Sequence, residues 1–173
     1  MEKPKKLYHG SSNKIEGALK PILQHGTLEH VHTNPAVFAT ARIDVASLFM
    51  FPIDILASIG FEKDIAYICI WGTAEEFSSK DRSGFMYVLP SDSFEKVGKE
   101  YEWQSFEEVL PEEVKEYPSV ITGMIENRVQ VYFITDDQVF DRIVQEKDNR
   151  APILQQIVSE NQKRNINARD FSD

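Results

Sequence analysis

Cysteine is almost absent from this chain, and long hydrophobic runs are absent altogether. Cys69 is the single cysteine in 173 residues, which excludes an intramolecular disulfide and a CxxC metal or redox motif. Its apolar neighbours predict a buried strand, so we expect Cys69 to be an inert core thiol. No run can span a bilayer, and residues 1–6 lead into a predicted strand without a hydrophobic secretory segment. We therefore expect a cytoplasmic protein without a membrane partner.

Basic residues are also in the minority. Lys and Arg total 19 against 28 Asp and Glu, which gives a formal net charge of −9. Such a surface repels phosphate backbones and disfavours non-specific nucleic-acid binding. The hydrophobic content of 42% is typical of a globular protein, and the length favours one domain over residues 1–173. Within it we expect a core at 6–135, appended helices at 136–165 and a flexible tail at 166–173.

Short strands and helices are both predicted, with no internal repeat. Strands are expected at 6–9, 36–40, 65–71, 85–89, 105–110 and 127–134. Helices are expected from Thr40 toward Met50, at 53–58, at 137–145 and at 152–162. Thr40 is the expected N-cap of the first helix, and the negative charge of Asp44 in the first turns interacts favourably with the positive end of the helix dipole. Strands that precede inserted and appended helices predict the α+β class.

Two short motifs carry the chemistry of the chain. The first is Y-H-G-S at Tyr8–Ser11, and the second is F-A-T-A-R-I-D-V-A at Phe38–Ala46. Glycine lets a carboxamide approach the backbone closely, an imidazole can hydrogen-bond a ribose hydroxyl, and an aromatic face can stack on a nicotinamide ring. The candidate ligand is therefore NAD.

The motifs resemble those of the ADP-ribosyltransferase superfamily, in the branch that begins with histidine and contains diphtheria toxin, the poly(ADP-ribose) polymerases and the rifampicin ADP-ribosyltransferases. The rifampicin enzymes carry a similar H-G-T and a Y-[ILV]-T-x-T-L-D-A-A run, which Phe38–Ala46 matches without a gap. Phe85–Pro90 and then Ser93-Phe94-Glu95 are similar to their next strand and acidic turn. The resemblance spans roughly residues 7 to 110 through spaced short motifs.

This resemblance implies two small facing sheets with NAD in the cleft between them, and transfer of ADP-ribose to an acceptor. Cleavage of the nicotinamide–ribose bond passes through an oxocarbenium-like state, which a nearby carboxylate stabilises. Glu102 is the expected catalytic acid, because it lies beside Trp103 where the third motif of the superfamily would fall. Glu100 is the second candidate. Alignment with the rifampicin enzymes, which use an aspartate, gives Glu95 instead.

The other expected roles also follow from the resemblance. His9 would anchor a ribose hydroxyl, Gly10 would hold the carboxamide through its backbone, Phe38 would stack, and Ser11 and Thr40 would support the pocket. Most relatives carry tyrosine in place of Phe38, so the stacking surface is kept and a hydroxyl is lost. We expect the side chains of His9, Phe38 and one of the three glutamates to converge on one cleft.

Several alternatives stay open. The chain could be a non-catalytic NAD or ADP-ribose binding module, with its glutamates as solvated surface charge and Phe38 as core packing. An RNA 2′-phosphotransferase is a related activity, but those relatives use several arginines and few lie near the motifs here. The third alternative is a toxin-type protein that acts through its C-terminal helices. No metal is expected, since His30-x-His32 lacks a second ligand cluster. The acceptor stays open between protein, nucleic acid, small molecule and water.

Overall fold

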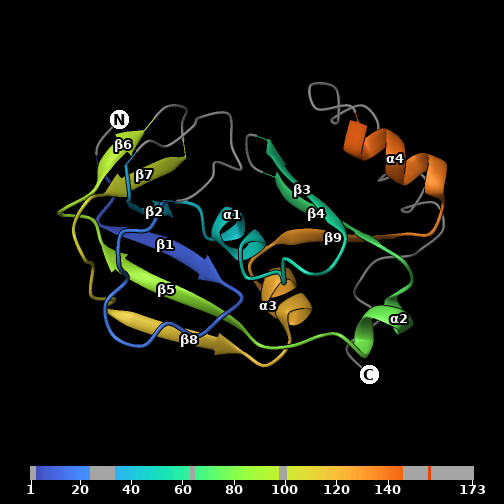
Figure 1. Cartoon of the computed structure of the whole chain (residues 1–173), viewed down its shortest axis with the longest axis horizontal. Helices are drawn as coiled ribbons and strands as arrows, with labels where there is room; N and C mark the ends of the chain where they lie inside the picture. Colours follow the sequence, from blue (N-terminus) through green and yellow to red (C-terminus); the bar gives the residue numbers. More distant parts are fainter. Residues whose placement is uncertain (1–2, 24–33, 63–64, 98–100, 146–155, 157–173) are drawn as a thin grey trace.

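A computed structural model describes residues 3–23, 34–62, 65–97, 101–145 and 156 of the chain, which form two β-sheets with short helices (Figure 1). The strands are β1 Lys6–Ser11, β2 Val37–Thr40, β3 Ala57–Glu62, β4 Ile65–Trp71, β5 Gly84–Pro90, β6 Glu95–Val97, β7 Glu102–Ser105, β8 Glu113–Tyr117 and β9 Val129–Ile134. The helices are α1 Ile43–Leu48, α2 Ala74–Ser78, α3 Val120–Glu126 and α4 Asp137–Gln145. The predicted α+β class is confirmed.

The larger sheet carries both sequence motifs. Its six strands have the order β6-β7-β2-β1-β5-β8, so β1 and β2 occupy its centre. β1 pairs with β5 along its whole length, from Lys6 opposite Pro90 to Ser11 opposite Phe85. β2 pairs with β7 over all four of its residues. A strand late in the sequence is thereby placed beside the strand of the second motif.

The smaller sheet has the order β3-β4-β9 and faces the larger one across α1 and α3 (Figure 1). β4 is antiparallel to β3 and parallel to β9. The main apolar core lies between the sheets, and its members from α1, the two sheets and α3 include Ala46, Leu48, Met86, Ile68, Val131 and Met124. Each sheet also packs a second apolar cluster on its outer face: Leu7, Tyr87 and Trp103 on the larger sheet, Cys69 and Phe140 on the smaller.

Most of the predicted strands are present, together with the helix at 137–145. Cys69 is buried, as expected. The predicted helix at 53–58 is wrong, because residues 57–62 pair with β4 as an edge strand and this pairing outweighs the helix-start signal of Pro52. The predicted strand at 105–110 is also wrong, since β7 ends at Ser105. The predicted helix at 152–162 lies, apart from residue 156, outside the described residues.

Six elements were not predicted from the sequence: α2, β3, β6, β7, β8 and α3. β8 gave no signal because four of its five residues are exposed, so its sequence lacks an apolar alternation. α2 and α3 are short helices fixed by their caps, in which Thr73 and Ser119 accept backbone N–H bonds. Short elements of this kind depend on neighbours more than on their own pattern.

A buried polar network ties α1, β8 and α3 together. The Nδ2 of Asn127 donates to Ser47 Oγ at 2.9 Å and to the Tyr117 hydroxyl at 3.0 Å. Ser47 Oγ in turn donates to the Ile43 carbonyl at 2.7 Å. Because the side chains of Asn127, Ser47 and Tyr117 all lie in the core, each needs its partner.

Replacing Asn127 by Ala should therefore lower the free energy of unfolding by about 2 kcal/mol, since the buried Tyr117 hydroxyl and Ser47 lose a partner. Urea denaturation of both proteins measures this difference. Asn13→Ala, at an exposed position, is the matched control and should stay within about 0.5 kcal/mol of the parent. Equal losses in the two variants would show that the network contributes nothing specific.

Candidate functional site

The first motif lies where the pairing of the central strands breaks. Among the described residues, β1 and β2 pair through Tyr8 and Thr40 alone. The Val88 carbonyl accepts from Glu112 N–H at 2.8 Å on the far side of β5, so Val88 and Tyr8 form a non-hydrogen-bonded pair. Tyr8, and two residues later Gly10, therefore direct their backbone groups toward β2. The ladder stops before Gly10, and we call this interruption the β1–β2 break.

His9 fills part of the β1–β2 break. Its Nδ1 lies 2.7 Å from the carbonyl oxygen of Phe38, which is where the ladder would continue. A carbonyl oxygen only accepts, so Nδ1 carries the proton and donates it. Burial lowers the pKa of His9 below its usual value, and the weaker effect of the Phe38 carbonyl raises it. The neutral ring therefore keeps Nε2 as a hydrogen-bond acceptor, which suits a hydroxyl donor.

The lowered pKa of His9 predicts a pH dependence of stability. The unfolded chain binds a proton at this histidine as the pH falls through about 6.5, whereas the folded chain takes it up only at lower pH. The contribution of the neutral His9 ring to the free energy of unfolding should therefore be fully present above that pH and be lost as the pH falls below it. His9→Asn keeps an N–H donor and does not titrate, so it should show a shallower decline between pH 7 and pH 5. Urea titrations at several pH values measure both slopes, and parallel slopes would contradict the prediction.

Gly10 is required by a close approach of α1. A methyl group built on Gly10 would overlap the backbone carbonyl of Ala46, and it would lie 3.3 Å from Met50 Cγ. The face of β1 that carries Tyr8 and Gly10 thus lies against α1, while the backbone edge of Gly10 points along the sheet to the β1–β2 break. The predicted use of that edge by a carboxamide stays a prediction.

The second motif and β7 share one face of the sheet. Thr40 lies opposite both Tyr8 on β1 and Glu102 on β7, and Phe38 lies opposite Gln104. Directly opposed residues point to the same side, so Phe38, Thr40 and Glu102 share the side of Tyr8. The Phe38 side chain is 8% exposed, which means that its ring is mostly covered. The burial of Phe38 establishes that its ring packs in the protein interior. Stacking of the ring on a ligand stays a prediction.

His9 belongs to the opposite face. It is in register with Tyr87, and the two rings meet edge to face with centroids 6.1 Å apart. The expectation that the side chains of His9, Phe38 and a glutamate share one cleft is therefore not met, because strand alternation divides them between two faces. His9 and Phe38 are joined through the contact of the His9 ring with the Phe38 backbone carbonyl. A ligand that uses both sets must lie at the β1–β2 break.

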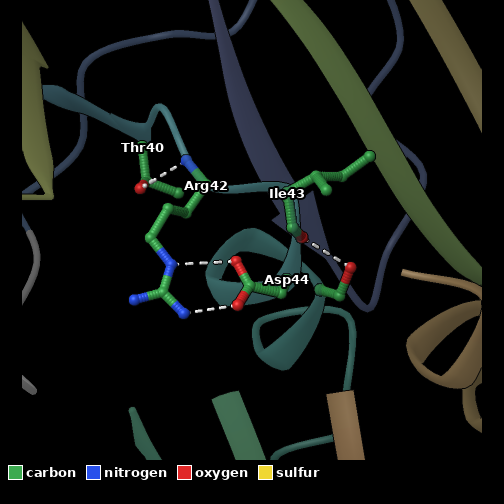
Figure 2. Close-up of polar contacts among 5 residues, drawn as sticks. Thr40, Arg42, Ile43 and Asp44 are labelled. Atoms are coloured by element: carbon green, nitrogen blue, oxygen red, sulfur yellow. Dashed lines mark hydrogen bonds and ion pairs between the residues drawn. The ribbon is translucent and has the colours of Figure 1, made fainter. Parts of the chain in front are cut away.

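The turn from β2 into α1 holds a charged cluster that the sequence analysis did not single out (Figure 2). Arg42 donates to Asp44 through Nε at 3.0 Å and through Nη2 to the second carboxylate oxygen. The guanidinium also lies 4.9 Å from the centroid of the Tyr101 ring. The hydrogen bond to Asp44 raises the pKa of Arg42 more than burial lowers it. Arg42 was not predictable as a site residue, because its contact with the Tyr101 ring joins segments far apart in the sequence.

The expected N-cap role of Thr40 is wrong. α1 begins at Ile43 after Arg42, and no side chain caps it. The Thr40 Oγ1 accepts instead from the Arg42 N–H at 3.1 Å and closes the turn before the helix (Figure 2). Thr40 is 7% exposed, so its hydroxyl is committed to this turn.

The remaining predicted residues lie apart or are not described. Ser11 ends β1, and its hydroxyl donates to the Asn13 carbonyl at 2.7 Å. Glu95 is exposed at the start of β6, two strands away from the β1–β2 break. Glu100 lies outside the described residues. Glu102 is the candidate acid that opens the strand beside β2.

Comparisons with known proteins found no matching family model, curated protein or solved structure. In the described part of the chain, no helix is long and apolar enough to cross a membrane. The same residues contain no group of three or more His, Cys, Asp or Glu that could hold a metal. An open hollow of about 730 Å³ beside α2 is lined by residues that include Asp54, Trp71 and Arg82, none of which belongs to the predicted site.

Proposed function

We propose that this chain has the ADP-ribosyltransferase fold and cleaves NAD at the nicotinamide–ribose bond, passing ADP-ribose to an acceptor. The observation that carries the proposal is the register of the larger sheet. β7 lies beside β2 and sets Glu102 directly opposite Thr40, while β1 on the other side of β2 carries His9 and Gly10. Three neighbouring strands thus bring together motifs that are far apart in the sequence.

The chemistry assigns a separate task to each residue. The neutral His9 ring offers Nε2 to a ribose hydroxyl, because Nδ1 is engaged by the Phe38 carbonyl. The backbone edge of Gly10 at the β1–β2 break suits the N–H and C=O groups of a carboxamide. Glu102, partly exposed, stabilises the positive charge that develops on the ribose as nicotinamide leaves.

NAD in this proposal is a substrate, and the residues that contact it come from both sides of the β1–β2 break. Phe38 lies on β2 beside the β1–β2 break, and in this proposal the edge or face of its ring contacts the bound NAD. Ser11 and Thr40 act indirectly, because their hydroxyls close local turns. The proposal includes the cytoplasmic location expected from the sequence and leaves the acceptor open.

The main rival is a non-catalytic NAD or ADP-ribose binding module. The covered ring of Phe38 and the division of side chains between two faces favour it over a fully assembled catalytic cleft. Both functions require NAD to bind at the β1–β2 break. They differ in whether the nicotinamide–ribose bond is broken.

Incubation of the purified protein with NAD labelled on its adenylate decides between them. An active enzyme releases nicotinamide and moves the label to an acceptor or to free ADP-ribose. A binding module leaves NAD intact while NAD raises the melting temperature in a concentration-dependent way. The absence of both turnover and a thermal shift at millimolar NAD would overturn the proposed function and its rival together.

A further inference from the structure

Tyr101, the residue that precedes Glu102, forms a charged and aromatic cluster with Arg42 and Asp44. We call these three residues the clamp. The Arg42 guanidinium lies over the Tyr101 ring at 4.9 Å from its centroid. Asp44 fixes the plane of that guanidinium with two parallel hydrogen bonds (Figure 2). The side chains of Arg42 and Asp44 are 16% and 15% exposed, so water screens the pair only in part.

The clamp is anchored at both of its ends. On one side, the Arg42 N–H donates to Thr40 Oγ1 at 3.1 Å, and Thr40 is the register partner of Glu102. On the other side, the Tyr101 ring meets Phe61 of β3 edge to face, with centroids 5.9 Å apart. The clamp therefore connects the start of α1, the start of β7 and the smaller sheet.

We propose that Arg42 and Tyr101 are positioning residues that fix the Glu102 carboxylate relative to the β1–β2 break. Glu102 is the first residue of its strand, and the end of a short strand is prone to fraying. A ring held between Arg42 and Phe61 immediately before it restricts that motion. The inference rests on the proposed function, because it assigns the clamp to the reaction that Glu102 would assist.

Arginine is required at this position for a geometric reason. Its planar fork binds both carboxylate oxygens of Asp44 and stacks on an aromatic ring at the same time. Lysine keeps the charge but cannot bind both carboxylate oxygens of Asp44 with a planar group, and it cannot stack on the Tyr101 ring. Arg42→Lys is therefore a conservative change in charge that removes the clamp, and Tyr101→Phe is a conservative change that retains the ring.

The test compares kcat and KM for NAD cleavage in Arg42→Lys, Tyr101→Leu and Tyr101→Phe. The first two should lower kcat about tenfold with KM within about twofold, because a small displacement of a catalytic group slows the chemical step more than binding. Tyr101→Phe should keep most of the turnover. Lys115→Gln is the matched control, since it removes a cation that lies 4.2 Å from the Tyr117 ring on β8, outside the proposed machinery.

A double variant separates positioning from general support of the fold. In the Glu102→Gln background, Tyr101→Leu should lower kcat no further, because there is no catalytic carboxylate left to position. A further tenfold loss in that background would overturn the proposal, and so would unchanged kcat in Arg42→Lys. If Tyr101→Leu does not fold, Arg42→Lys combined with Glu102→Gln answers the same question.

Amide hydrogen exchange at Glu102 and Gln104 keeps the two proposals distinguishable. A wild-type protein that never cleaves NAD overturns the proposed function. Faster exchange at these amides in Arg42→Lys, with no change in Lys115→Gln, would then still establish the clamp as the structure that holds β7. Unchanged exchange would overturn the clamp itself, whatever the activity.

Discussion

Glu102→Gln should strongly slow the cleavage of NAD while leaving its binding nearly unchanged. A neutral amide has almost the shape of the carboxylate, so the ground-state complex is preserved. The charge that stabilises the oxocarbenium-like transition state is lost, and an interaction made only in the transition state affects kcat rather than affinity. We expect a loss in kcat on the order of a hundredfold or more. Release of labelled nicotinamide measures the rate, and calorimetric titration with NAD measures the affinity.

Glu95→Gln is the matched control, because it makes the same chemical change at an exposed position on β6. This variant should have a kcat within about twofold of the wild-type value, as expected for a surface charge away from the reacting atoms. A large loss in Glu95→Gln with none in Glu102→Gln would reverse the assignment of the acid. A wild-type protein that binds NAD without turnover, and that Glu102→Gln does not change, would favour the binding module.

Gly10→Ala should destabilise the fold severely, because α1 leaves no room for a side chain at this position of β1. The added methyl group would overlap the Ala46 carbonyl, and a helix backbone cannot move aside as a flexible side chain can. α1 must shift away from β1, which disturbs its packing in the main core. We expect the free energy of unfolding to fall by about 3 kcal/mol or more, at the upper end of overpacking effects. Denaturation in urea measures the loss.

Gly17→Ala provides the comparison. Gly17 has a φ of +77° and open space around it, so the added methyl group meets no atom within 4 Å. Its cost is the backbone strain of a left-handed residue alone, about 1 kcal/mol. If Gly10→Ala and Gly17→Ala lose the same stability, the close contact between β1 and α1 is not what requires glycine at position 10.

The sequence determined the class of the fold and several of its strands. Alternation at Val129 and Val131 and the apolar run around Cys69 are local signals, and both predicted strands are present. The helix at 137–145 followed from its apolar stripe in the same way. The segment Phe38–Ala46 likewise predicted a strand followed by a helix, although the helix begins at Ile43 and Thr40 is not its N-cap.

Tertiary structure decided the arrangement of the candidate site. Which strand lies beside β2 is a long-range choice, and it places Glu102, and not Glu95, opposite Thr40. Residue alternation places His9 on the face opposite Phe38, so side chains whose motifs follow one another along the chain are divided by the sheet.

The contact of Arg42 with Tyr101 depends on the same kind of information. Its partner Tyr101 lies at the start of β7 and meets Phe61 from the other sheet, and these contacts exist only after both sheets have formed. Local sequence encodes propensity and period, whereas strand order, register and the close approach of α1 to Gly10 depend on packing between distant segments. The sequence by itself thus determined the α+β class and several of the strands and indicated candidate site residues, and packing decided which of those residues meet.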